Sequence, residues 1–195
     1  IDIPDFGTTD FDDFEKGILL NKQSNDASIP VIYGTRLVGG TRVFMETSGT
    51  DNTYLYMAIV LSEGEINGIT EIRVDDKVVT FASSLADNTA VEVASSDSNF
   101  YKNSASLIRL EPHFGSDGQS ASSLLGTLSS WGSNHKLSGL AYLAIRFTWN
   151  QDAFNSIPKV QAKIQGKKIV TLNSSLTESS PTFSANPAFC LLDYL

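Results

Sequence analysis

The stretch from residue 53 to 61 constrains the fold most, because it is apolar on both faces of an extended strand. Successive side chains of a strand point to opposite faces. One face would carry two tyrosines and two small aliphatic residues, and the other four long aliphatic residues: Tyr54, Tyr56, Ala58 and Val60 against Leu55, Met57, Ile59 and Leu61. Such a strand needs protein on each side. The pattern therefore predicts the central strand of a layered β structure.

Much of the chain from Gly17 onward alternates with period two, as strands with one buried face do. Asp75–Asp76 is expected to turn one hairpin, and Gly39–Gly40 is expected to form a turn or bulge within another. The further strands expected are residues 36–47, 70–79, 89–94, 106–112 and 140–149. We expect a mainly β fold with a few helices, in which antiparallel sheets form a barrel-like or sandwich-like unit.

One segment interrupts the strand pattern with helical spacing. Its apolar residues fall at the i, i+3, i+4, i+7 and i+10 positions, and Gly132 stands where a helix C-cap would be. This spacing predicts one helix near residues 119–131. Trp131 would lie on its buried stripe, and Trp149 would continue the inward face of the strand at 140–149, so we expect both indoles in the core.

The two ends of the chain differ from the region between them. Residues 1–16 form an acidic arm with interleaved phenylalanines, which we expect either to tuck its aromatic rings onto the domain or to dock on a basic partner. Residues 17–185 form the β-rich region, with two subdomains possible. Residues 186–195 predict an N-capped helix with Pro at its first position, interpreted as the start of a longer helix leading to further domains.

Composition and motifs exclude several classes of function. The net charge of −8 argues against stable nucleic-acid binding. The single Cys190 excludes an intramolecular disulfide and a Cys-rich zinc site, and no apolar run is long enough to cross a membrane. Neither a nucleophile elbow nor a phosphate-binding glycine loop occurs. We therefore expect no enzyme, no cofactor, no metal and no membrane insertion by this chain.

A basic strip lies in the otherwise acidic chain, because residues 153–177 contain four lysines and no acidic residue. The lysines alternate with apolar side chains, and Gly166 would turn a hairpin between them. They are Lys159, Lys163, Lys167 and Lys168. Lysines on an edge hairpin guard against aggregation, but the same strip could also meet an acidic partner.

Four blocks, in order, resemble the amino-terminal part of the host-specificity (J-type) tail-tip proteins, which are central baseplate hub proteins of long-tailed, non-contractile phages. The blocks are residues 29–41 (IPVIYGTRLVGGT), 58–69 (AIVLSEGEINGI), 157–168 (IPKVQAKIQGKK) and 186–195 (NPAFCLLDYL). Together they span most of the sequence after the acidic arm.

This resemblance implies a structural hub, usually a homotrimer, at the distal end of a virion tail assembled in the bacterial cytoplasm. It implies contacts with distal tail or tube-ring proteins and with a tape-measure protein, and a lumen through which DNA can pass. It carries over no catalytic residue. We expect the basic strip and the acidic arm, including Asp10, Asp12 and Asp13, to lie at subunit or ring contacts, because their charges are opposite.

The residues alone are also compatible with two other functions. A carbohydrate-binding β-module would expose Trp131 or Trp149 beside polar groups. A non-catalytic fragment of a hydrolase would retain a cleft with an ionisable group.

Overall fold

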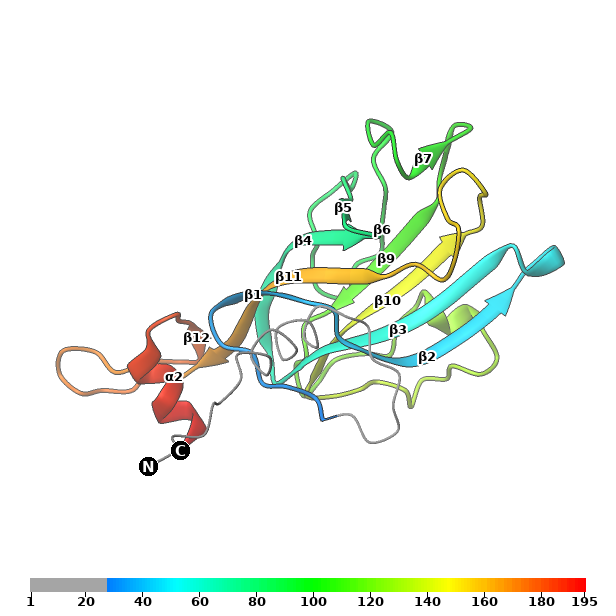
Figure 1. Ribbon diagram of the computed structural model, residues 1–195. Coiled ribbons are helices and arrows are strands. Elements are labelled where there is room, and N and C mark those ends of the chain that lie inside the picture. Colours follow the sequence, from blue (N-terminus) through cyan, green and yellow to red (C-terminus); the bar gives the residue numbers. More distant parts are fainter. Residues whose placement is uncertain (1–27) are drawn as a thin grey trace, which may run out of the picture.

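A computed structural model describes residues 28–195, and the acidic arm lies outside the described residues (Figure 1). Two antiparallel sheets form the body. The strand order of the first is β2-β3-β10-β9-β6, and that of the second is β1-β11-β4-β5, with β12 also paired to β11. This arrangement confirms the expected β-rich sandwich-like or barrel-like fold.

The strands have the following bounds. The first sheet contains β2 (Thr41–Ser48), β3 (Tyr54–Glu63), β6 (Val91–Glu92), β9 (Ile108–His113) and β10 (Leu140–Thr148). The second contains β1 (Thr35–Val38), β4 (Ile66–Val74), β5 (Lys77–Val78), β11 (Val160–Ile169) and β12 (Thr182–Phe183). A small separate hairpin joins β7 (Tyr101–Lys102) to β8 (Ala105–Ser106), and the α-helix α2 spans Pro187–Tyr194.

The strand that is apolar on both faces forms where the sequence predicts it, as β3. In β3, Met57, Ile59 and Leu61 belong to the main core cluster with residues of the second sheet, whereas Tyr56, Ala58 and Val60 belong to a smaller cluster. The smaller cluster is covered by the connection between β9 and β10, which also buries Trp131. Both layers required by the pattern are therefore present.

The helix expected near residues 119–131 is absent; only one 3-10 turn, Leu125–Thr127, forms there. The buried carboxylate of Glu111 explains the difference. It accepts hydrogen bonds from the backbone N–H of Leu124 at 2.7 Å and of Ser123 at 3.1 Å, and from two serine hydroxyls. The backbone N–H groups of Ser123 and Leu124 therefore bond to a carboxylate outside the segment, whereas in a helix they would bond to backbone carbonyls within it. The apolar side chains are still buried, so the spacing identified the buried stripe but not the backbone conformation.

Gly39–Gly40 does not turn a hairpin. β1 pairs with β11 and β2 pairs with β3, so the chain crosses here from one sheet to the other. Gly40 has φ of 70°, and a Cβ on it would stand 2.5 Å from the carbonyl oxygen of Val60. The glycine pair therefore permits a corner between sheets. By contrast, Asp75 and Asp76 do turn the hairpin from β4 to β5, with φ of 48° and 63°.

Gly166 is also not in a turn. β11 continues through it as one ten-residue strand between β1 and β4, so the lysines do not lie on an edge hairpin and an edge-guarding role is wrong. Near Gly166 the backbone N–H of Lys167 donates to the carbonyl of Ile32 at 2.7 Å. The glycine gives the crossing chain room to approach the strand.

The expected helix at residues 186–195 is present as α2. The side chain of Asn186 accepts from the backbone N–H of Ala188, and Pro187 is the first helical residue. This is the capping arrangement that the sequence predicts.

Candidate functional site

The four lysines of the basic strip lie along β11 and just before it, and three of them are paired within the chain. Lys159 Nζ lies 3.1 Å from Asp76, Lys167 Nζ lies 2.7 Å from Asp193, and Lys168 Nζ lies 2.5 Å from Glu65. Lys163 is exposed and forms no ion pair with a described residue. Asp10, Asp12 and Asp13 lie outside the described residues. Of the strip, Lys163 is thus the lysine available to a partner.

Asp193 anchors α2 to the sheet. Its Oδ2 accepts from Lys167 Nζ at 2.7 Å and from the hydroxyl of Tyr33 at 2.5 Å. Burial alone would raise the pKa of Asp193, but the hydrogen bonds from Lys167 and Tyr33 outweigh it and lower that pKa. The carboxylate is therefore charged at neutral pH and joins residues far apart in sequence.

The remainder of α2 presents apolar side chains to solvent. Its one charged residue faces the domain, whereas Leu191, Leu192 and Tyr194 are more than half exposed. A shallow hollow beside the helix continues this surface onto Val31 and Tyr33. Contiguous exposed apolar surface of this kind indicates a contact with other protein.

Replacing Asp193 with Asn is expected to loosen α2 without unfolding the sheets. The neutral amide keeps the shape but loses the charge-assisted bonds, so amide hydrogen exchange in residues 187–194 should accelerate about tenfold. The same exchange experiment on β10 serves as the internal control and should be unchanged. Equal protection of α2 in both proteins would show that Asp193 does not hold the helix.

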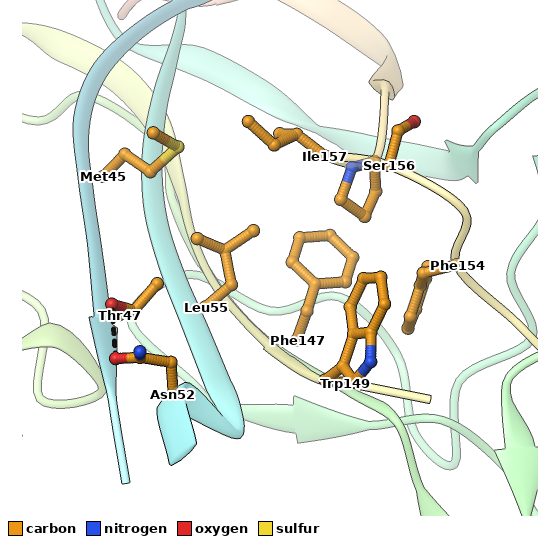
Figure 2. A pocket seen from close by; sticks show the side chains of 10 residues that line it. Met45, Thr47, Asn52, Leu55, Phe147, Trp149, Phe154, Ser156 and Ile157 are labelled. Carbon is orange, nitrogen blue, oxygen red and sulfur yellow. Dashed lines mark hydrogen bonds between the residues drawn. The ribbon is translucent and has the colours of Figure 1, made fainter. Parts of the chain in front are cut away.

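A second surface feature is an apolar groove near the start of β3 and the end of β10, shown in Figure 2. We call it the Trp149 groove. It holds about 230 Å³ and lies between β2, β3 and β10 and the loop that leads into β11. Most of its wall is aliphatic or aromatic, formed by Met45, Leu55, Phe147, Trp149, Phe154, Ile157 and Pro158. The three polar residues that line it are Thr47, Asn52 and Ser156.

Trp149 is not in the core. Its side chain is 54% exposed, because β10 ends at Thr148 and the chain turns away there, whereas Trp131 is 5% exposed as expected. Exposure of one indole is what a carbohydrate-binding module requires. However, Thr47 and Asn52 hydrogen-bond to each other at 3.0 Å, and the rest of the wall is almost entirely apolar. The groove therefore suits an apolar side chain better than a sugar ring.

Sequence reasoning missed this groove, although one signal for it exists. In β2, Val43 and Met45 alternate with Phe44, so both faces of a short strand carry apolar side chains, as in β3. Val43 and Met45 are nonetheless 48% and 42% exposed, and neither belongs to a core cluster of the described residues. An apolar strand that stays half exposed indicates a partner.

The most strongly perturbed carboxylate lies in the interior. Burial would raise the pKa of Glu111, but the nearby His113 and the donors from Ser122 to Leu124 lower it to about 2. His113 is fully buried, stacked on Tyr142 at a ring-centroid distance of 4.2 Å, with Nε2 3.4 Å from Glu111. The hydroxyls of Ser122 and Ser123 donate to Glu111. This buried carboxylate therefore holds the loop between β9 and β10 from the interior.

Two kinds of feature, a metal-binding cluster and a membrane-spanning helix, are not found among the described residues. They contain no cluster of three or more histidine, cysteine or acidic side chains placed to bind a metal ion. No helix in residues 28–195 is both long and apolar enough to span a bilayer. A third hollow, near Ser122 and Trp131, contains one ionisable side chain, Lys136.

The sequence is similar to that of a phage structural protein. No protein-family model matches the sequence. The baseplate hub protein pb3 of Escherichia phage T5 is 26% identical over 206 aligned residues, which cover 86% of this chain and 22% of that protein. The chain thus spans about a fifth of the length of this relative. Among solved structures, a chain from the virion of the native gene transfer agent (GTA) particle aligns with a TM-score of 0.49 and 16% identity, over 76% of this chain and 29% of that one.

Proposed function

We propose that this chain is a non-catalytic structural part of a phage tail, within the hub at the tail's distal end. The observation that carries the proposal is the similarity to the T5 baseplate hub protein over most of this chain. The buried position of Glu111 and His113, the site with the most perturbed carboxylate, is consistent with a role that needs no turnover.

The resemblance of residues 29–41, 58–69, 157–168 and 186–195 to J-type tail-tip proteins supports a finer proposal. The chain forms the amino-terminal part of a homotrimeric hub in the virion, assembled in the host cytoplasm. It joins ring proteins of the tail tube and the tape-measure protein, and connects them to host-binding parts that follow α2. The acidic composition lets DNA pass through the lumen without being bound.

Two described surfaces are available for these contacts. Lys163 offers a free positive charge near the middle of β11, and the outer side of α2 offers exposed leucines and Tyr194. Contacts between subunits typically combine apolar area with a few charged groups that set orientation. We assign Lys163 to the ring contact and α2 to the continuation toward the host-binding parts.

Replacing Lys163 with Glu is expected to reduce incorporation of the protein into particles, because a negative charge would face an acidic partner surface. Lys136→Glu is the matched control, since Lys136 is also exposed but lies in the loop before β10. The readout is the amount of each variant in purified particles relative to a tail-tube protein, with thermal unfolding as the folding check. Incorporation of K163E at the K136E level would contradict the assigned contact.

A further inference from the structure

The first sheet carries a row of charged and aromatic side chains on the face that is turned away from the second sheet. The residues beside this row in sequence, such as Met57 and Ile145, belong to the core between the sheets. The row crosses all five strands in register, and from β2 to β6 it reads Glu46, Tyr56, Arg146, Arg109 and Glu92. It therefore has an acid at each end and two arginines side by side in the middle.

The two arginines lie directly opposite each other on β10 and β9. Side chains in this arrangement have Cβ atoms roughly 5 Å apart, and like charges there destabilise a sheet. In the described part of the chain, Arg109 meets one carboxylate, that of Glu92, at a distance of 3.6 Å. Arg146 lies over the ring of Tyr54, at 5.1 Å from its centroid, and pairs with no described carboxylate. The arginine pair thus carries more positive charge than its described neighbours neutralise.

A carboxylate placed between the two arginines would correct this imbalance. A guanidinium group presents its N–H donors in a planar fork that matches the two oxygens of a carboxylate. The Nε atoms of both arginines have no hydrogen-bond acceptor among residues 28–195, so their donors are incompletely used. The side chain of Arg109 is 42% exposed and Arg146 is partly exposed, so a group from another molecule can reach the pair.

The surroundings of the arginine pair favour a protein partner over a nucleic acid. Glu46 and Glu92 stand four strand spacings apart, or about 19 Å, so a polyanion laid along the row would meet like charge at both ends. A protein segment can instead present one carboxylate with neutral groups beside it. Tyr54 and Tyr56 lie next to the pair, with ring centroids 6.5 Å apart. Tyrosine and arginine are the residue types that often dominate the binding energy of protein interfaces.

We propose that the pair formed by Arg109 and Arg146 is a docking site for an aspartate or glutamate side chain of a partner protein. The site is separate from the ring contact assigned to Lys163, because Lys163 lies on the second sheet. It does not depend on the proposed tail function, since the isolated chain can be tested for it.

A peptide titration of the isolated chain tests the chemistry of the site. The probe is a short peptide with one glutamate between alanines, and its neutral counterpart has glutamine instead. At low salt, the guanidinium NMR signals of both arginines should saturate at about a fivefold lower concentration of the glutamate peptide. The signal of Arg73 is the control, because its side chain is 38% exposed and already pairs with Glu71 at 2.6 Å. Equal responses to the two peptides, or an equal response of Arg73, would overturn the site. Tighter binding of a DNA duplex at the pair would overturn the protein partner.

A matched pair of variants tests docking in the assembled particle. Arg109→Gln and Arg73→Gln each remove one exposed arginine that has one acidic neighbour. Purified particles should contain several-fold less of R109Q than of R73Q, with thermal unfolding showing that both variants stay folded. Equal incorporation would overturn the docking site. Failure of the proposed tail function would look different, because the natural chain would then be missing from the particles as well, and the peptide titration would decide the site by itself.

Discussion

Replacing Glu111 with Ala is expected to lower the free energy of unfolding by about 3 to 5 kcal/mol. The carboxylate is 2% exposed and accepts from two backbone N–H groups and two serine hydroxyls. Alanine would leave these donors buried without an acceptor, in a loop that also covers Tyr142 and Trp131. Chemical denaturation of both proteins measures the difference.

Glu92→Ala is the matched control for this prediction. Glu92 lies on β6 of the same sheet, but its side chain is 48% exposed and its ion pair with Arg109 is long, at 3.6 Å. Its loss should change the free energy of unfolding by less than about 1 kcal/mol. Similar losses in the two variants would mean that the Glu111 hydrogen bonds do not hold the loop.

The pKa of Glu111 gives the same prediction a pH signature. Folding lowers this pKa from 4.5 to about 2, so the stabilisation is complete above pH 4.5 and is lost as the pH falls toward 2. The shift corresponds to about 3 kcal/mol at 1.36 kcal/mol per unit. The difference in unfolding free energy between the natural chain and Glu111→Gln should shrink by this amount between pH 5 and 2. A constant difference would contradict the lowered pKa.

Replacing Gly166 with Ala is expected to cost about 3 kcal/mol or to prevent folding. A Cβ at this position would stand 2.0 Å from the carbonyl oxygen of Ile32 and 2.7 Å from its carbonyl carbon. Both atoms belong to backbone that hydrogen-bonds to β11 through Lys167, so neither the strand nor the crossing chain can move aside cheaply. Thermal and denaturant unfolding measure the loss.

Gly126→Ala is the control for this clash. A Cβ at Gly126 would meet nothing within 4 Å, so its effect should stay within about 0.5 kcal/mol. If Gly166→Ala were as stable as Gly126→Ala, the close crossing of residues 32–34 over β11 would be wrong.

The sequence predicted those features that are determined by neighbouring residues. Alternation along β3 identified a strand covered on both sides, and Asn186 with Pro187 identified the start of α2. The apolar spacing before Gly132 identified which side chains are buried. It did not identify their conformation, because the Glu111 carboxylate that replaces helical hydrogen bonds is distant in sequence.

Features that depend on distant partners could not be read from local pattern. Gly40 and Gly166 both resemble hairpin turns in sequence, yet each is a glycine because another stretch of backbone lies against it. The pairing of Lys167 with Asp193 likewise joins two elements that the sequence treats separately. Trp149 followed the inward strand pattern but lies beyond the end of β10, where the opposite sheet no longer covers it.

A cryo-electron microscopy reconstruction of the particle that contains this chain tests the central claim most directly. The account predicts density for the paired five-stranded sheets at the distal end of the tail, repeated around the tail axis, with α2 directed toward the host-binding parts. Particles complete in every other respect but without this density at the tail end would contradict it.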